Sequence, residues 1–464
     1  MVSAGYHRSM AGFPRRFGLG LLVLVVAGSG CDQRAVSLRD GSMPAQGEAG
    51  GGGGTIGGGG GTIGTSSGGS TGGDAGAATG TGGGDAGIGE AGSGGIGADA
   101  AGTGGGGIDG GSSGTAGSPG AFSSVSPLVP YRARHTATLL KNGKVLIAGG
   151  WGRDLAPIAT MELFDPATGM FSAAGTMSPA RVYHSATLLA NGTVLIVAGQ
   201  VYGGSSGSTT CTSMVQIYNP DSGTFASVPS LARYQCEHVA TSLSDGRVLI
   251  VGSYADGEME VFSPATSQFT KTGSMVTPRI AGHTATTLND GRVLVVGGVS
   301  VSAVYTASAE AFDPVTGSFA AVGNMARSRG YHTATVLPDG KVLIGGGIET
   351  NTSAGATYRP NVEIFDPATN TFAPGPVLAF AYDQATATRL LDDSILVVGG
   401  VSSAGPQALG QLYDPAGKTF SFAASLSVAR YAHTATLLPG GAVLIVGGET
   451  GTGPSIVPAE IYSR

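Results

Sequence analysis

One phrase of sixteen positions recurs along residues 121–464, and this repetition constrains the fold more than any other feature. With local variation, the phrase reads His-Thr-Ala-Thr-Leu-Leu-x-Asn/Asp-Gly-x-Val-Leu-Ile-x-Gly-Gly. Repeats with periods of roughly 20–50 residues are typical of solenoids, propellers and other arrays. The first positions, spaced by 49, 54, 45, 49, 53 and 48 residues, are His135, His184, His238, His283, His332, Ala385 and His433.

Each copy predicts four β-strands. The first strand is the His-Thr-Ala-Thr segment, and a two-residue turn such as Asn142-Gly143 follows it, because Asn-Gly favours tight hairpins. The second strand is a continuous apolar run such as Val145–Ile147, which suits a strand covered on both faces. The third strand carries Glu or Gln two residues before an aromatic residue. A turn containing Asp-Pro leads to the fourth strand, which opens with Phe.

These features together resemble the kelch repeat. The resemblance lies in the double glycine and in two aromatic residues seven positions apart with Asp-Pro between them, as in Phe164 and Phe171. Phe stands where kelch repeats usually have Trp at the second aromatic position. The resemblance covers 121–464 and implies an all-β fold, a seven-bladed kelch-type β-propeller with four-stranded blades.

The two ends of the repeat region predict how the ring closes. The seventh copy stops at Tyr462-Ser463-Arg464, just after its third strand. Phe122 lies 13 residues before His135, as Phe171 lies 13 residues before His184. We therefore predict that an N-terminal strand containing Phe122 completes the last blade, which pairs edges that an open array would expose.

The N-terminal segment resembles a bacterial lipoprotein signal. Arg8, Arg15 and Arg16 precede the apolar run 17–27, and small residues lead to Cys31. The resemblance implies that residues 1–30 are a signal peptide and that Cys31 receives a lipid that attaches the chain to a membrane. We therefore expect an exported protein, lipid-anchored in the bacterial cell envelope, in the periplasm or at the cell surface.

Residues 31–120 are expected to be a disordered Gly-rich linker. The stretch 41–120 holds 38 of the 84 glycines of the chain, and its apolar side chains are too few to offset the entropy of ordering. Residues 121–464 carry 19 basic and 22 acidic residues without a basic cluster. Nucleic acid is therefore not an expected partner, because phosphate binding needs clustered Lys or Arg.

The repeated polar residues have a structural interpretation. A residue that recurs in nearly every copy is expected to serve the repeat itself, so the histidines should hydrogen-bond neighbouring blades, together with the arginine three residues before them. The Glu of the third strand should pair with this layer, since buried charges need partners. The sixth copy lacks both the His and the Arg and has Tyr382, Asp383 and Gln384 before Ala385.

Tyr183-His184-Ser185 supports an alternative function. This segment resembles the Tyr-His-Ser segment of galactose oxidase and glyoxal oxidase, copper-radical enzymes on seven kelch-like blades, in which the Tyr and His are copper ligands. Those enzymes also need a tyrosine cross-linked to a cysteine and a histidine from a domain after the propeller. Neither is evident here, so we expect no metal, no cofactor and no catalytic residue, and Tyr183 and His184 remain the metal candidates of the alternative.

Cys211 and Cys236 are the cysteines of the repeat region, and we expect a disulfide between them. Cys211 lies in the loop between the second and third strands of the second blade, and Cys236 precedes the first strand of the third blade. In a four-stranded meander both positions lie on the same face. An exported chain favours disulfide formation between such cysteines.

The loops between second and third strands vary in length, whereas the Asn/Asp-Gly and Asp-Pro turns of the opposite face do not. Variable loops on a rigid scaffold are the usual place for recognition. The function favoured by the sequence is therefore the binding of a protein or glycan at this variable-loop face, by a monomer. The aromatic residues expected on this face, which could instead pack between blades, are Trp151, Tyr183, Tyr234, Tyr331, Tyr382 and Tyr431.

Overall fold

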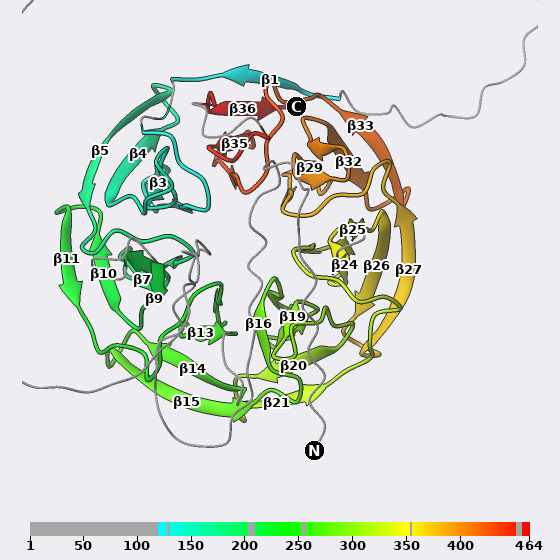
Figure 1. The fold of residues 1–464 in the computed structure, drawn as a ribbon, viewed down its shortest axis with the longest axis horizontal. Helices are drawn as coiled ribbons and strands as arrows, with labels where there is room; N and C mark the ends of the chain where they lie inside the picture. The colour runs from blue at the N-terminus through cyan, green and yellow to red at the C-terminus, as the bar shows by residue number, and fades with distance from the viewer. Residues whose placement is uncertain are drawn as a thin grey trace, which may run out of the picture. The chain divides into compact units, whose positions relative to one another are not determined.

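The computed structural model describes residues 119–464 except 127, 129, 203–208, 253–256, 353–354 and 452–456. In this part, seven four-stranded antiparallel sheets surround one axis (Figure 1), so the predicted seven-bladed propeller is confirmed. The expected signal peptide 1–30, the lipid attachment residue Cys31 and nearly all of the expected linker 31–120 lie outside the described residues. No helix of the described ranges is long and apolar enough to cross a membrane.

Each blade begins with the strand nearest the axis and ends with the outermost strand (Figure 1). Blade 1 contains β2 (Thr136–Leu139), β3 (Val145–Ala148), β4 (Thr160–Asp165) and β5 (Met170–Thr176). Blade 2 contains β6 (Ser185–Leu188), β7 (Val194–Val197), β10 (Val215–Asn219) and β11 (Thr224–Ser227). Blade 3 contains β12 (Val239–Ser242), β13 (Val248–Val251), β14 (Glu258–Ser263) and β15 (Gln268–Ser274).

The next three blades have the same order of strands. Blade 4 contains β17 (Thr284–Thr287), β18 (Val293–Val296), β20 (Ala309–Asp313) and β21 (Ser318–Ala321). Blade 5 contains β22 (Thr333–Val336), β23 (Val342–Gly345), β26 (Asn361–Asp366) and β27 (Thr371–Val377). Blade 6 contains β28 (Thr386–Arg389), β29 (Ile395–Val398), β32 (Gly410–Asp414) and β33 (Thr419–Ala423).

Blade 7 joins the two ends of the described chain, as predicted. It contains β34 (Thr434–Leu437), β35 (Val443–Val446), β36 (Glu460–Ser463) and, as its outermost strand, β1 (Ala121–Ser124). Phe122 pairs with Tyr462, and the centroids of their rings lie 5.1 Å apart. The aromatic pair that every other blade forms within one hairpin is here formed by two strands from opposite ends of the domain.

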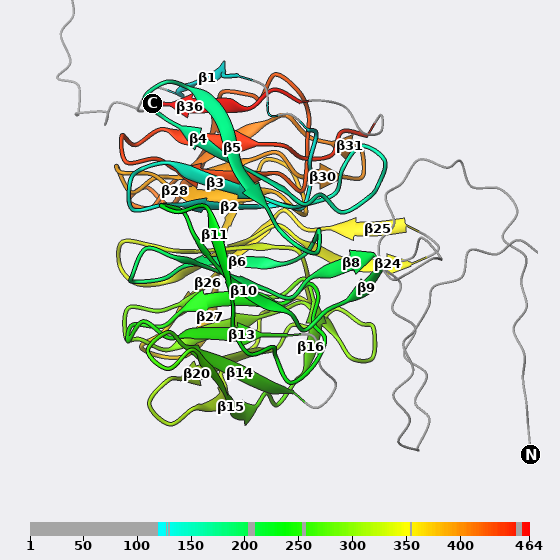
Figure 2. The same ribbon diagram turned by 90° about the vertical axis from the view of Figure 1, so that its left-hand side faces the viewer.

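The loops on one face carry four short two-stranded sheets. Figure 2 shows the hairpins β8–β9 and β24–β25 projecting on the same side of the blades. This is the variable-loop face, made of the loops between second and third strands and the segments that enter each first strand. The short strands are β8 (Gln200–Tyr202), β9 (Thr209–Cys211), β16 (Arg279–Ala281), β19 (Val299–Ser300), β24 (Ile348–Thr352), β25 (Gly355–Tyr358), β30 (Val401–Ser402) and β31 (Gly405–Pro406).

The hydrophobic core lies between the blades. One cluster packs Leu146 and Met161 of blade 1 against Val194 and Ile196 of blade 2, and all four side chains are buried. Alternate residues of each second strand face the preceding and the following blade, so both faces of the strand are covered. This is why the second strands are continuous apolar runs rather than alternating ones.

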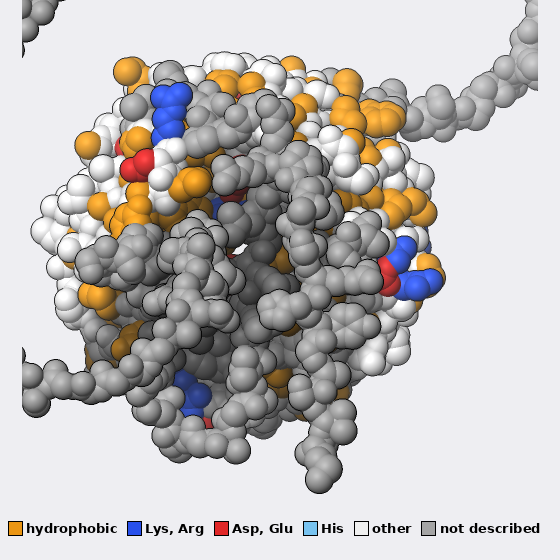
Figure 3. Space-filling model, in the orientation of Figure 1, with side chains coloured by type: hydrophobic (Ala, Val, Ile, Leu, Met, Phe, Trp, Pro, Cys, Tyr) orange, Lys and Arg blue, Asp and Glu red, His pale blue; other side chains and the backbone are white. Residues whose placement is uncertain are grey.

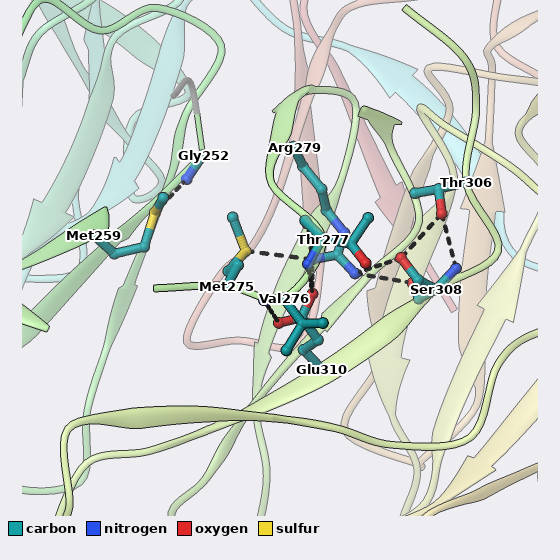
Figure 4. A network of polar contacts seen from close by, with 9 residues as sticks. All are labelled: Gly252, Met259, Met275, Val276, Thr277, Arg279, Thr306, Ser308 and Glu310. Atoms are coloured by element: carbon teal, nitrogen blue, oxygen red, sulfur yellow. Dashed lines mark hydrogen bonds and ion pairs between the residues drawn. The ribbon is translucent and has the colours of Figure 1, made fainter. Parts of the chain in front are cut away.

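A polar layer lies at the inner part of each blade, and blade 4 shows it in full (Figure 4). The fully buried Arg279 guanidinium pairs with Glu310 on β20 at 2.9 Å and donates to the carbonyl oxygen of Ser308 at 3.1 Å. Glu310 also accepts hydrogen bonds from the backbone amides of Val276 and Thr277. The carboxylate therefore ties the segment arriving from blade 3 to the third strand of blade 4.

The same layer recurs in other blades, which confirms the predicted pairing of the third-strand Glu. Blades 3 and 6 lack the arginine, and there Glu260 and Gln411 accept hydrogen bonds from the backbone amides of Ala232 and Ala379. In blade 4 the arginine lies four residues before its histidine instead of three. The remaining pairs are Arg132–Glu162, Arg181–Gln216, Arg329–Glu363 and Arg430–Glu460.

The histidines connect adjacent blades, as predicted. The Nε2 atom of His184 shares a hydrogen bond with Thr136 Oγ1 of the preceding blade at 3.1 Å, and His332 does the same with Thr284 at 3.0 Å. Burial and the positive charge of Arg329 lower the pKa of His332 to about 3. These histidines are therefore uncharged at physiological pH and connect the first strands of adjacent blades by hydrogen bonds.

The closing strand provides a test of ring integrity. Phe122→Ala removes a partly buried ring that packs on Tyr462, so we expect the free energy of unfolding to fall by about 2 kcal/mol in urea denaturation. Phe422→Ala is the matched control, because Phe422 on β33 is 65% exposed. Equal free energies of unfolding of the two variants would contradict the conclusion that β1 closes the ring by completing blade 7.

The polar layer provides a second test, in blade 4. Glu310→Leu leaves the buried Arg279 without its carboxylate, and the free energy of unfolding should fall by about 3–5 kcal/mol. Glu310→Gln reproduces the Arg181–Gln216 pair of blade 2 and should cost less than about 2 kcal/mol. Urea denaturation of both variants measures the difference, and a Gln variant as unstable as the Leu variant would overturn this interpretation.

Candidate functional site

The residue immediately before each first position of the repeat lies next to the propeller axis. These seven residues, called here the axial residues, line a cavity of about 310 Å³ together with His135, Ala385 and His433. The cavity lies where the first strands begin, which is the variable-loop face, and Figure 3 views the molecule from this face. The axial residues are Arg134, Tyr183, Glu237, Gly282, Tyr331, Gln384 and Ala432.

The backbone holds the axial residues in a left-handed conformation. All seven have φ between 50° and 65°, although only one of them is glycine. Backbone hydrogen bonds join neighbouring positions: the amides of Tyr331 and Gln384 donate to the carbonyls of Gly282 and Tyr331, at 2.7 and 3.1 Å. Such a conformation is unfavourable for residues with a Cβ and persists only where the surroundings impose it. The repeat therefore places seven side-chain positions around the axis at a conformational cost.

One side of the axial cavity is built around Arg134. Its Nε atom pairs with Glu449 Oε1 at 2.9 Å, and its guanidinium carbon lies 5.1 Å from the centroid of the Tyr183 ring. Glu449 follows the double glycine of blade 7 and accepts a hydrogen bond from the Tyr431 hydroxyl at 2.7 Å. Trp151 meets the Tyr183 ring edge-on, with centroids 6.5 Å apart. This side thus combines an ion pair with three aromatic residues.

A carboxyl group, that of Glu237, lies on another part of the wall, and a second, that of Asp383, directly precedes the axial residue Gln384 without itself lining the cavity. The Tyr331 hydroxyl donates to Glu237 Oε2 at 3.2 Å, and burial raises the pKa of Glu237 while Arg134 opposes the rise. Asp383 stands beside the axial residue Gln384, and its side chain is buried. Burial raises the pKa of Asp383 to about 7, against the lowering effect of a hydrogen bond from Gln384 and of Arg134. Both carboxyl groups are therefore held in surroundings that disfavour their negative charge.

The aromatic residues predicted for the ligand face have different positions in the structure. Tyr183 and Tyr331 line the axial cavity, Trp151 contacts Tyr183, and Tyr431 donates to Glu449, the partner of the lining residue Arg134. Tyr234 lies outside the cavity lining and is 67% exposed. For these five residues, ligand binding remains a prediction.

The placement of Tyr382 on the ligand face was wrong. Its side chain is only 1% exposed and belongs to the core between blades 5 and 6. The Tyr382 ring lies against Gly346, where the histidine of the next blade lies against the corresponding glycine elsewhere, as His184 does against Gly149. Because Ala385 leaves that space open, the tyrosine ring fills it.

The copper ligands of the alternative function do not come together. Tyr183 faces the axial cavity, whereas the His184 ring is buried between blades and shares its hydrogen bond with Thr136. Burial, with Arg181 and His238, lowers the pKa of His184 to about 3. Among the described residues, no three His, Cys, Asp or Glu side chains form a group that could hold a metal ion. The donor set therefore does not fit a copper-radical centre.

Cys211 and Cys236 are joined by a disulfide with an S–S distance of 2.03 Å and a Cα–Cα distance of 5.4 Å. The bond connects the end of β9 to the segment entering β12, next to a backbone bridge between Thr212 and Gln235. Cys236 directly precedes the axial residue Glu237. The disulfide therefore fixes the chain on which one wall of the cavity depends.

Sequence reasoning missed Arg134, Glu237 and Glu449, and it named Gln384 without assigning it a site. A signal was present in the alignment of the copies: the position before the histidine differs in almost every copy, whereas the positions around it repeat. Glu449, which follows the double glycine of blade 7, carries no such signal. Its partnership with Arg134 joins residues 315 positions apart and depends on ring closure.

Comparisons with known proteins agree with the fold. Residues 281–326, which span blade 4, match the family model of the Kelch motif. The chain is similar in structure to a fungal alcohol oxidase of the AA5 family solved in complex with copper, with a TM-score of 0.61, 19% identity, and coverage of 75% of this chain and 76% of that one. It is also similar to YjhT, with a TM-score of 0.51, 13% identity, and coverage of 64% and 99%. No curated protein sequence matches the chain.

The disulfide provides a stability test close to the site. Replacing both cysteines, Cys211→Ser with Cys236→Ser, should lower the free energy of unfolding by about 3 kcal/mol, because the bond closes a loop of 25 residues. A reducing agent should destabilise the native chain by a similar amount and leave the double variant unchanged. Two free thiols in the oxidised native chain, or no effect of the reducing agent on it, would contradict the assignment.

Proposed function

This chain is a kelch-repeat β-propeller, and we propose that it is an exported binding module whose axial cavity takes one unit of a glycan. One observation carries this proposal: the axial residues differ from copy to copy in a repeat that otherwise conserves its residues from blade to blade. The repeated Arg, Glu and His side chains are used within the propeller. The axial residues are the ones that the repeat leaves available for a ligand.

The composition of the cavity wall supports a saccharide more than a protein surface. Specific small-ligand sites are concave and combine aromatic surface with a few placed polar groups. Tyr183 and Tyr331 offer ring faces for the C–H surface of a sugar, while Arg134, Gln384 and Glu237 offer donors and acceptors for hydroxyl groups. A cavity of about 310 Å³ admits a terminal unit of a chain rather than a folded surface.

The proposed location rests on the sequence and on cysteine usage. The segment 1–30 and Cys31 resemble a bacterial lipoprotein signal, and the Gly-rich segment 31–120 would tether the propeller to the membrane lipid. A disulfide between Cys211 and Cys236 suits an oxidising compartment outside the cytoplasm. We propose that the propeller acts as a monomer in the cell envelope.

An oxidase function is the weaker proposal. The fungal alcohol oxidase shares the fold at 19% identity, and fold alone does not give function. The side chain of His184, which that function would need as a ligand, is used between blades 1 and 2. Hydrogen peroxide release with sugars or aldehydes in the presence of copper would favour the oxidase and count against a simple binding module.

A glycan array tests the binding function. We expect the purified chain to bind a restricted set of glycans and Tyr331→Ala to weaken that binding by about tenfold or more, since the ring lines the cavity. Tyr234→Ala is the matched control, because Tyr234 lies outside the cavity lining, and it should keep native affinity. Absence of glycan binding, or equal losses in both variants, would contradict the proposal.

A further inference from the structure

We propose that the ligand group seated in the axial cavity is a protonated amine, so that the glycan unit recognised is an amino sugar with a free amine. This inference rests on the proposed function and narrows its ligand class. It follows from the balance of charges around the cavity, from the partners that those charges already have, and from the aromatic rings beside them.

The positive charge of the cavity wall is already paired. Arg134 is the only basic side chain other than the buried histidines among the described residues that line the cavity. Its Nε atom is 2.9 Å from Glu449, and its guanidinium lies over the Tyr183 ring. A negatively charged ligand would have to compete with Glu449 for this guanidinium. An acidic sugar is therefore disfavoured at this position.

Two carboxyl groups near the cavity lack a basic partner at ion-pair distance. Glu237 accepts a hydrogen bond from the Tyr331 hydroxyl and forms no ion pair within the described residues. Asp383 is 5% exposed, and its Oδ1 atom has no hydrogen-bond partner in the same part of the chain. Buried carboxylates without partners are unfavourable, and a cation bound in the cavity reduces that penalty.

Asp383 is the one carboxyl group at its position of the repeat. The corresponding position, two residues before the first position of the copy, is occupied in the other six blades by Ala133, Val182, Cys236, Ala281, Gly330 and Tyr431. No contact of the polar layer described above uses Asp383. Asp383 is therefore a carboxyl group that the repeat does not require, and it directly precedes the axial residue Gln384, so its charge can act on a ligand in the cavity.

Aromatic rings border the same side of the cavity. Tyr331 lines it, and the Tyr305 ring packs against Gly330, the residue that directly precedes Tyr331. Burial and the nearby Asp383 raise the pKa of Tyr305 to about 12, so its ring stays neutral. Neutral aromatic faces attract cations, and the combination of such faces with carboxylates is a usual way to recognise an ammonium group.

This arrangement makes binding dependent on pH. A cation prefers the ionised carboxylates, so its binding releases the protons held by Asp383, whose pKa burial raises to about 7, and by Glu237, whose pKa burial also raises. For an amine that stays protonated, affinity should therefore increase as the pH rises toward about 7 and decrease as the pH falls. The other titratable or charged groups that face these two carboxyls are Arg134, Tyr183, Tyr305, Tyr331 and Tyr358.

Isothermal titration calorimetry with two matched probes tests the inference. The probes are a trimer of β-1,4-linked glucosamine and the same trimer with every amine acetylated, titrated into the full chain. We expect the free-amine trimer, whose amines ionise at about pH 7, to bind about tenfold or more tightly at about pH 6.5, where most of them are protonated, and to lose most of this advantage at about pH 5. Titrations at about pH 6, where the ligand amines already hold their protons, in buffers of different ionisation enthalpy should show proton release on binding.

Variants locate the effect. Glu237→Gln and Asp383→Asn each keep the shape of the side chain and should reduce the preference for the free amine by about fivefold or more. Glu258→Gln is the matched control, because Glu258 pairs with Lys271 on β14 and β15, away from the cavity lining, and it should keep the full preference. Thermal unfolding shows whether each variant is folded. Proton release is measured on the native chain, so this part of the test does not depend on the folding of any variant.

The outcomes separate this inference from the proposed function. Four outcomes would each overturn the inference that the cavity binds a protonated amine. They are equal affinity for the two trimers, tighter binding of the acetylated trimer, no binding of either trimer, and no proton release on binding. If neutral or acidic glycans from the array bind and Tyr331→Ala lowers their affinity, the proposed binding function is supported. The inference that the ligand is a protonated amine is then wrong. If no glycan binds at all, the proposed function and this inference both fail.

Discussion

The buried polar layer between blades is the interaction on which the rest of this propeller depends. A fully buried arginine and a third-strand carboxylate, as in Arg279 and Glu310, join the entry segment of a blade to its interior. Neutral histidines then link the first strands of adjacent blades. Because these charged and polar groups satisfy one another, the apolar second strands can pack on both faces around the whole ring.

This use of the conserved residues determines where function can reside. The chain enters each first strand through a residue with positive φ, held by backbone hydrogen bonds to the neighbouring blade. That residue lines the axial cavity and belongs to none of the hydrophobic clusters between blades. The copies can therefore differ there, as Arg134, Glu237 and Gln384 do, without loss of the fold. The likeness to an AA5 alcohol oxidase is a likeness of the fold, and the axial side chains of this chain differ from blade to blade.

Much of the architecture could be predicted because the sequence repeats at regular intervals. The spacing of the copies predicted the seven blades, and the offset from Phe122 to His135 predicted the strand that closes blade 7. Tyr382 was misplaced because a sequence position does not reveal which neighbouring space is empty, and Ala385 creates such a space. The Arg134–Glu449 pair was missed because it exists only when the first and last blades meet. The axial cavity likewise needs all seven blades to be placed around one axis.

The most direct test of the account is an NMR titration of the histidine rings of the native chain. Burial lowers the pKa of His184, His238 and His433 to about 3, so the account predicts that the ring signals of the propeller histidines stay unchanged from about pH 8 to about pH 5. Signals of a solvent-exposed histidine would shift in that range. Two results would contradict the claim that these residues hold the ring together. One is that several propeller histidines titrate near their ordinary pKa, and the other is that added copper shifts their ring signals.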